Sequence, residues 1–278
     1  ICHYTGLDHA AEDVVPNDLA RQLAEKFWPG PLTMIFHKSD KMPSAVTAGL
    51  STVAIRFPSN KVARKLIEKS GLPLAAPSAN LSGSPSPTTA NHVFNDLNGK
   101  IPAILDGGPC EVGLESTVVL LAEDKVTLLR PGAITVEMLE EAVPHVEVDK
   151  GVLHKIDDNE KVLSPGMKHT HYSPKANVCI VDSNFEQFKR FIEAHKHENL
   201  GAMVFDGEEQ ELDVPCVTFG REDDSIIQAK LLFSSLRAID DLGVDRIYAR
   251  MPDVNGIGLA IYNRLLRAAG FEVITLND

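Results

Sequence analysis

The sequence has few cysteines, no long apolar run and too few basic residues to balance its acidic ones. The four cysteines lie far apart and form no Cys-x-x-Cys pair, which excludes a zinc ribbon and a disulfide scaffold and favours a cytoplasmic location. Lys and Arg number 27 against 39 Asp and Glu, a net charge of −12, so direct coating of DNA or RNA is not expected. No apolar stretch approaches the roughly 20 residues that span a bilayer, so no membrane partner is expected.

What remains is an ordinary globular composition. Of 278 residues, 44% are apolar and 24% charged, which argues against wholesale disorder, collagen and coiled coil. At about 150 residues per domain, this length favours two domains. The chain starts at Ile1 without a methionine or a signal-peptide pattern, and we expect an N-terminal part of a longer protein to precede it.

Strand-like and helix-like segments alternate up to about residue 142. Two consecutive strands among helices indicate a mixed sheet in this part. Helices are predicted at 17–27, from about Asn60 to Gly71, from about Thr88 and at 135–142, and strands at 32–36, 52–57, 74–76, 102–106, 116–121 and 126–130.

A linker and a second unit follow. Residues 143–175 show no sustained period and hold two Ser-Pro dipeptides, which predicts a linker. From 176 onwards, strands alternate with long amphipathic helices, which predicts a smaller three-layer α/β domain with a parallel sheet. The strands are expected at 178–182, 201–205, 216–219 and 246–251. The predicted organisation is therefore 1–142, a linker or lid at 143–175, and 176–278.

The segment Pro77 to Ser86 is the richest in candidate ligand-binding groups. It follows the end of a strand, where open α/β sheets bind ligands, and its hydroxyls and amide suit phosphate or carboxylate oxygens. A polar turn without a ligand is the alternative interpretation. The segment is no Walker loop, because GxxxxGK[ST] is absent.

Two arginines are candidates for an anion clamp. Arg56 lies in mid-strand between apolar neighbours, and Arg130 lies at a strand end in Leu-Leu-Arg-Pro-Gly. A guanidinium forms two parallel hydrogen bonds with a carboxylate or phosphate. The alternatives are a solvent-facing strand residue for Arg56 and an arginine that satisfies nearby carbonyls for Arg130.

Three other motifs give weaker evidence for a functional site. Glu115-Ser116-Thr117 opens a strand, and without GxSxG a hydrolase triad is not expected. His169 and His171 alone fill half of a zinc shell, so no metal site is predicted. Gly256-Ile257-Gly258 lacks the third glycine of a nucleotide loop and indicates close helix packing.

Six segments occur in one order that is similar to a known family. They are FWPGPLT at 27–33, VAIRFP at 53–58, the segment 76–83, GLESTV at 113–118, LRPG at 129–132 and SPGM…HYSP at 164–174. Over essentially its whole length, the chain resembles the long, two-domain threonylcarbamoyl-AMP synthases. The resemblance implies a YrdC-like catalytic domain with a twisted mixed sheet, then the linker and the second α/β domain.

The resemblance also implies a reaction. L-threonine, bicarbonate and ATP would give threonylcarbamoyl-AMP and pyrophosphate, with Mg²⁺ bound to the ATP and no metal held by the protein alone. The product would pass to a tRNA threonylcarbamoyl transferase complex for N6-threonylcarbamoylation of adenosine 37. Threonine would meet His3, Arg56, Ala76 and Ser116, and ATP would meet Thr52, Ser78, Ser86, Arg130 and Ser164, with Asn80 and Tyr172 in support. The segment 164–174 would close over the pocket as a lid.

The sequence departs from this family in one respect. Family members carry a Pro-Thr-x-Thr-x-Tyr-Gly-Leu segment and a Lys-x-Arg motif ahead of the position that matches Ile1, and neither occurs in the 278 residues. The expectation is that this chain alone is inactive. Two alternatives stay open: a non-catalytic tRNA- or ribosome-associated binding protein of the same fold, and a carbamoyl transfer like that of hydrogenase-maturation enzymes. The linker and second domain argue against the latter.

Overall fold

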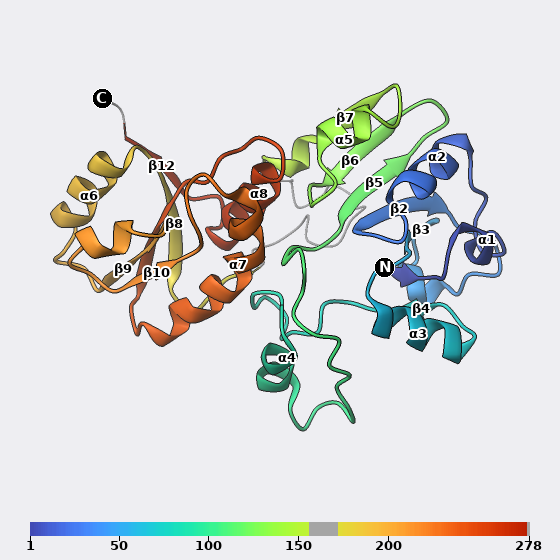
Figure 1. The fold of residues 1–278 in the computed structure, drawn as a ribbon, viewed down its shortest axis with the longest axis horizontal. Helices are drawn as coiled ribbons and strands as arrows, with labels where there is room; N and C mark the ends of the chain where they lie inside the picture. The colour runs from blue at the N-terminus through green and yellow to red at the C-terminus, as the bar shows by residue number, and fades with distance from the viewer. Residues whose placement is uncertain (156–171, 277–278) are drawn as a thin grey trace.

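The computed structural model describes residues 1–155 and 172–276, which form two α/β units (Figure 1). Strands of the first unit are β1 (Cys2–His3), β2 (Leu32–His37), β3 (Thr52–Arg56), β4 (Leu74–Ala75), β5 (Thr117–Leu121), β6 (Val126–Arg130) and β7 (Val146–Val148). Its helices are α1 (Leu7–Ala10), α2 (Asp18–Phe27), α3 (Lys61–Ser70), α4 (Ala90–Leu97) and α5 (Val136–Glu140), with 3₁₀ turns η1 (Ser44–Thr47) and η2 (Lys150–Val152). The seven strands form one mixed sheet in the order β4-β1-β3-β2-β5-β6-β7, which confirms the predicted mixed sheet.

Local capping sets the ends of the helices in the first unit. The Asn60 side chain accepts hydrogen bonds from the backbone N–H groups of Val62 and Ala63 at the start of α3. The helix ends at Gly71, whose φ of 67° lies in the left-handed region that glycine adopts without strain. The helix predicted from Asn60 to Gly71 is therefore confirmed.

The core of the first unit lies between α2 and one face of the sheet. Leu23 and Phe27 of α2 belong to the same buried cluster as Met34 of β2 and Ile55 of β3. Because side chains alternate along a strand, Ile55 on the buried face directs its neighbour Arg56 to the other face. The core thereby fixes the strand whose last residue carries the candidate anion clamp.

Two segments of the first unit differ from expectation. The prediction of a strand at 102–106 is wrong, because this segment pairs with no strand in the described residues and Leu105 is 64% exposed. Within the predicted linker, Val146–Val148 forms β7, which pairs parallel with β6 at the edge of the sheet. Strand β7 was not predicted because three residues are too few to show a periodic pattern. The segment 102–106 was predicted as a strand because its apolar residues resemble those of a strand, although no partner strand lies beside it.

The second unit is a three-layer parallel structure, as predicted. Its strands are β8 (Asn177–Asp182), β9 (Leu200–Val204), β10 (Cys216–Thr218), β11 (Arg246–Arg250) and β12 (Val273–Thr275), and its helices are α6 (Phe185–Ala194), α7 (Ser225–Ala238) and α8 (Gly258–Ala268), with 3₁₀ turns η3 (Glu208–Glu211) and η4 (Ile239–Asp241). All pairings in the sheet β10-β9-β11-β8-β12 are parallel. Residues of α7 and α8 join one buried cluster and residues of α6 another, on the two faces of this sheet.

The two units meet along α4, α7 and the loop that leads into β5. Asp96 of α4 pairs with Arg237 of α7, with 2.7 Å between Oδ2 and Nη2. Gly113 in the loop has a φ of 86°, and a Cβ there would lie 2.5 Å from the carbonyl oxygen of Ala229 in α7. The loop therefore contacts α7 backbone to backbone.

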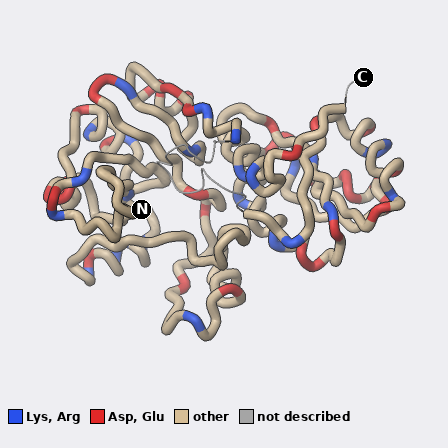
Figure 2. Tube along the Cα trace, turned by 180° about the vertical axis from the view of Figure 1, so that it is seen from behind, with Lys and Arg blue, Asp and Glu red and all other residues tan. Residues whose placement is uncertain are grey.

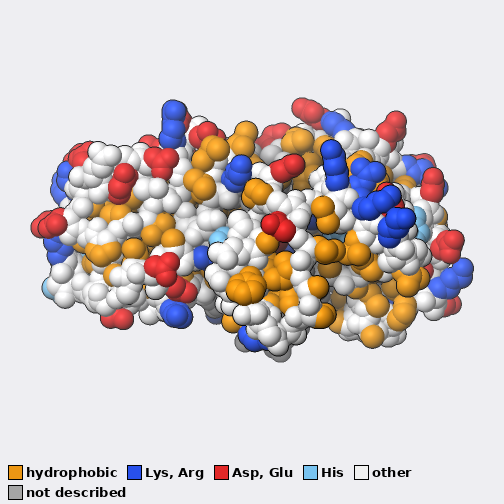
Figure 3. Space-filling view, turned by 60° about the horizontal axis from the view of Figure 1, so that its bottom comes forward, with side chains coloured by type: hydrophobic (Ala, Val, Ile, Leu, Met, Phe, Trp, Pro, Cys, Tyr) orange, Lys and Arg blue, Asp and Glu red, His pale blue; other side chains and the backbone are white. Residues whose placement is uncertain are grey.

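The surface mixes charges of both signs. Acidic and basic residues are interspersed along both units (Figure 2). On one face, hydrophobic side chains gather toward the middle while charged ones lie mainly around the rim (Figure 3). In residues 1–155 and 172–276, every helix is too short or too polar to span a bilayer.

Candidate active site

A cavity of about 490 Å³ lies where β1, β3 and β4 approach the loop before β5. It brings together eight of the residues predicted from the sequence, which come from segments up to 169 positions apart: His3, Arg56, Ala76, Ser78, Asn80, Ser116, Arg130 and Tyr172. The remaining lining residues are Ile1, Ala75, Pro77, Ser84 and Glu115. Residues from motifs that are far apart in the sequence thus line one cavity.

Three predicted residues do not line this cavity. Ser86 is buried beside it and donates its hydroxyl to Glu115 Oε1 at 2.6 Å. Thr52 pairs with His37 at the far end of β3, roughly 13 Å from Arg56 along the strand. Ser164 lies outside the described residues, as do His169, His171 and the rest of the predicted lid before Tyr172.

Strand pairing sets His3 beside Arg56. The two residues are partners in the parallel register of β1 and β3, and His3 Nδ1 lies 3.3 Å from the carbonyl oxygen of Leu74 in β4, which accepts the bond. Burial, and secondly the charge of Arg56, lower the pKa of His3 to about 4. The imidazole is therefore neutral near pH 7.

Arg56 is held by one nitrogen only. Its Nε donates to the carbonyl oxygen of Gly30 at 3.0 Å, and its two terminal nitrogens have no partner within the described residues. Gly30 has no room for a side chain, because a Cβ would lie 2.2 Å from the carbonyl oxygen of Phe27. Burial and the nearby Arg130 lower the pKa of Arg56, which marks a site where an anion is favourable.

Ser116 and Arg130 form a buried polar cluster. The Arg130 guanidinium donates to the Ser116 carbonyl oxygen from Nε at 3.1 Å and from Nη2 at 2.9 Å, and to Ser116 Oγ at 3.2 Å. Thr33 Oγ1 lies 2.7 Å from the same hydroxyl. Arg130 thus satisfies a neighbouring carbonyl, as one interpretation of its strand-end position expected, while it also lines the cavity.

Asn80 holds the turn that carries Ser78. Its Nδ2 donates to the carbonyl oxygens of Leu81 at 2.8 Å and Ser84 at 3.0 Å. Its Oδ1 is buried without a partner in the part of the chain that the structure describes. A buried acceptor of this kind on a cavity wall is suited to a ligand N–H or O–H group.

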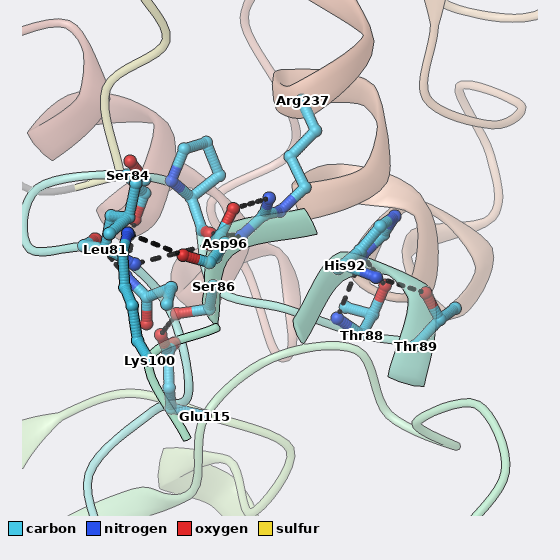
Figure 4. Close-up of polar contacts among 12 residues, drawn as sticks. Leu81, Ser84, Ser86, Thr88, Thr89, His92, Asp96, Lys100, Glu115 and Arg237 are labelled. Carbon is cyan, nitrogen blue, oxygen red and sulfur yellow. Dashed lines mark hydrogen bonds and ion pairs between the residues drawn. The ribbon is translucent and has the colours of Figure 1, made fainter. Parts of the chain in front are cut away.

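Glu115 is the charged lining residue that sequence reasoning missed. Its two oxygens accept hydrogen bonds from Ser86 Oγ and from Nε of Arg264 in α8, the latter at 2.7 Å (Figure 4 shows the Ser86 contact). Burial disfavours the charged carboxylate, but Arg264 and then Arg130 outweigh burial and hold the pKa of Glu115 at about 2. The sequence signals for it were its position beside Ser116 and its place in the segment GLESTV at 113–118.

Within the described ranges, no group of three or more His, Cys, Asp or Glu side chains is placed to hold a metal ion. The titratable side chains on the cavity wall include two arginines, a neutral histidine and a carboxylate that Arg264 and Arg130 compensate. Together with the mixed sheet and the adjoining parallel sheet, they define a two-unit α/β protein with a pocket whose arginines suit a small anionic ligand.

Comparisons with known proteins identify the family. Residues 1–132 match the model Sua5_yciO_yrdC, described as Telomere recombination, and residues 134–270 match the model described as Threonylcarbamoyl-AMP synthase, C-terminal domain. The chain belongs to the threonylcarbamoyl-AMP synthase family, a family of transferase enzymes. The family predicted from the six segments is confirmed.

Individual relatives cover most of both chains. Threonylcarbamoyl-AMP synthase of Bacillus subtilis is 46% identical over 260 residues, which is 92% of this chain and 74% of the relative. That of Pyrococcus abyssi is 42% identical over 264 residues, which is 92% of this chain and 75% of the relative. The crystal structure of P. abyssi Sua5 complexed with L-threonine matches with a TM-score of 0.90 at 38% identity, and covers 99% of this chain and 81% of that one.

Proposed function

We propose that this chain carries the substrate site at which threonylcarbamoyl-AMP forms from L-threonine, bicarbonate and ATP, with release of pyrophosphate, and that turnover also needs the Lys-x-Arg segment that its 278 residues lack. The observation that carries the proposal is Arg56, whose two terminal nitrogens face no protein partner in the described residues and which lines the cavity. A guanidinium fork of this kind matches a carboxylate in geometry and charge. The related P. abyssi structure that contains L-threonine supports threonine as the source of that carboxylate.

The other cavity residues divide between the two substrates. His3, the backbone at Ala76 and Ser116 complete the threonine site around Arg56. Ser78 and Arg130 serve the nucleotide from the cavity wall, and the resemblance adds Thr52, Ser86 and Ser164 to them. Asn80 and Tyr172 support the pocket, Asn80 by holding its turn and Tyr172 by packing on Phe233 of α7, with 5.1 Å between ring centroids.

The chemistry then needs positioning and charge stabilisation more than covalent help. The threonine nitrogen bonds to the carbon of bicarbonate as water leaves, and a carbamate oxygen attacks the α-phosphorus as the bond to pyrophosphate breaks. Arg130 stabilises negative charge on the nucleotide, and neutral His3 adds no further charge to the threonine site. Ser116 acts as a hydrogen-bonding group, since Thr33 and Arg130 fix its hydroxyl.

We propose that Mg²⁺ enters with ATP. Glu115 is the single carboxylate among the described lining residues, and both of its oxygens already have partners. Oxygen ligands for magnesium would therefore come from the nucleotide phosphates and water. The ion would neutralise part of the phosphate charge when bound.

We also propose that the product serves tRNA through a tRNA threonylcarbamoyl transferase complex in the cytoplasm. The net charge of −12 fits a protein that acts on tRNA by way of a small molecule. Binding of bulk tRNA by the chain itself would favour the alternative of a non-catalytic tRNA-associated protein.

Calorimetric titration of this chain with L-threonine tests the site, and pyrophosphate release in the presence of all three substrates, measured on a protein that also carries the Lys-x-Arg segment, tests the reaction. Arg56→Lys keeps the charge but loses the fork, so we expect the Kd for threonine to rise roughly 10- to 100-fold with little change in ATP affinity. Arg21→Lys, an exposed residue of α2, is the matched control and should bind like the wild type. Equal losses for both substrates would reassign Arg56 to the phosphates or to structure.

A further inference from the structure

A buried ion pair links the second unit to the candidate active site. Arg264 in α8 has a fully buried side chain, and its Nε donates to Glu115 Oε2 at 2.7 Å. Its Nη1 donates to Asn263 Oδ1 at 2.7 Å and its Nη2 to the carbonyl oxygen of Pro131 at 2.9 Å. Every nitrogen of the guanidinium has a partner, so the buried charge is compensated and its orientation is fixed.

The partners of Arg264 flank the residues of the proposed site on both sides. Glu115 directly precedes Ser116, and Pro131 directly follows Arg130. Arg264 therefore joins the entrance of β5 to the exit of β6, the two points between which Ser116 and Arg130 bond to each other. The second oxygen of Glu115 extends the chain of contacts to Ser86 at 2.6 Å (Figure 4).

The charge of Arg264 also acts on the candidate active site. Glu115 attracts Arg130, and its negative charge on the cavity wall opposes the binding of an anion nearby. Arg264 compensates that carboxylate from the side of the second unit. Because Arg264 neutralises Glu115, the glutamate offsets less of the positive charge of Arg130. More of that charge therefore acts on an anion in the cavity.

We propose that Arg264 is a positioning residue for the active site, supplied by the second unit: it holds Glu115 and Pro131 so that the neighbouring Ser116 and Arg130 face the substrates in the reacting geometry. This inference rests on the proposed function. It assigns to the second unit a direct part in building the substrate site, because α8 lies more than 120 residues beyond the last of these groups.

The test compares Arg264→Gln and Arg264→Lys with Arg250→Gln in the full chain. Arg250 is the matched control, since it is also buried in the second unit and paired with a glutamate, Glu208 at 3.1 Å, yet it contacts nothing in the first unit among the described residues. Calorimetry gives the Kd for ATP and for L-threonine, pyrophosphate release by a protein that also carries the Lys-x-Arg segment gives kcat, and thermal unfolding gives Tm.

We expect Arg264→Gln to raise the Kd for ATP and lower kcat, by roughly tenfold to a hundredfold together, because the reacting groups lose their alignment. Arg264→Lys should recover part of this loss. Arg250→Gln should lower Tm with unchanged Kd and kcat in the folded protein. Unchanged Kd and kcat in Arg264→Gln, or equal changes in Arg250→Gln, would overturn the proposal.

A second variant covers the case in which Arg264→Gln fails to fold. Glu115→Gln with Arg264→Gln removes both charges of the ion pair and leaves no carboxylate without Arg264, so it should fold and bind ATP more tightly than Arg264→Gln does, wherever both are measurable, but less tightly than the wild type. ATP affinity equal to the wild type in this folded double variant would contradict the role of Arg264. A wild-type chain that binds neither substrate would instead count against the proposed function.

Discussion

Gly30→Ala should separate the placement of Arg56 from its charge. The added methyl would lie 2.2 Å from the carbonyl oxygen of Phe27, and Cβ atoms essentially never approach closer than 3.0 Å. The backbone at position 30 must therefore move by about 0.8 Å. The Gly30 carbonyl oxygen is the sole protein partner of the Arg56 guanidinium within the described residues, at 3.0 Å from Nε. A displacement of that size breaks this bond or carries Arg56 with it.

A misplacement of about 1 Å at a reacting or binding group costs on the order of 100-fold, so we expect the Kd for L-threonine to rise by at least tenfold. Unfolding in urea should show a loss of roughly 1–3 kcal/mol from overpacking. Gly99→Ala is the control: its φ of 75° makes alanine strained but its surroundings are open, so it should lose stability without losing threonine affinity. Threonine binding within twofold of the wild type in folded Gly30→Ala would refute the reasoning.

Three further predictions concern the same cavity. The pKa of His3 is about 4 in the folded protein against 6.5 when free, so the unfolded state binds the proton more readily. The free energy of unfolding should therefore fall as the pH drops from about 6.5 to about 4. Urea titrations of His3→Gln should show a weaker pH dependence in that range. The pKa of Glu115 is held at about 2 against 4.5, so its contribution is present above pH 4.5 and lost as pH falls towards 2, and an acid-unfolding profile unchanged by Glu115→Gln would contradict it. Ser116→Ala leaves the Thr33 hydroxyl without its partner and should cost about 1–3 kcal/mol in denaturant unfolding, whereas a neutral result would mean that water replaces the serine.

Local signals along the chain predicted most of the framework. Helix α3 was readable because Asn60 caps it and Gly71 ends it, both through contacts within a few residues. Strand β3 was readable because Val53 and Ile55 alternate with half-buried neighbours. The apolar segment 102–106 gave the same kind of signal and is no strand, since strand formation also needs a partner that periodicity cannot report.

Only the site residues that lie in the family-like motifs could be predicted from the sequence. The resemblance places His3, Arg56 and Ser116 at threonine and Arg130 at ATP, and the fold brings all four to one cavity. The pair of Glu115 and Arg264 was not predicted, because its members lie 149 positions apart and each is unremarkable in its own segment. Such a pair exists only through the packing of the two units against each other.

The contact at Gly113 imposes two separate demands on one residue. Its φ of 86° asks for a residue that tolerates the left-handed region, and the backbone of α7 leaves no room for a Cβ. Asparagine satisfies the first demand and fails the second. A protein with this catalytic fold but without α7 would be free of the steric demand, so asparagine there would be acceptable, while here any side chain would push the units apart. The residues that position 113 tolerates therefore depend on how closely the backbone of α7 approaches this loop. A substitution at position 113 thus tests whether the second unit is packed against the first.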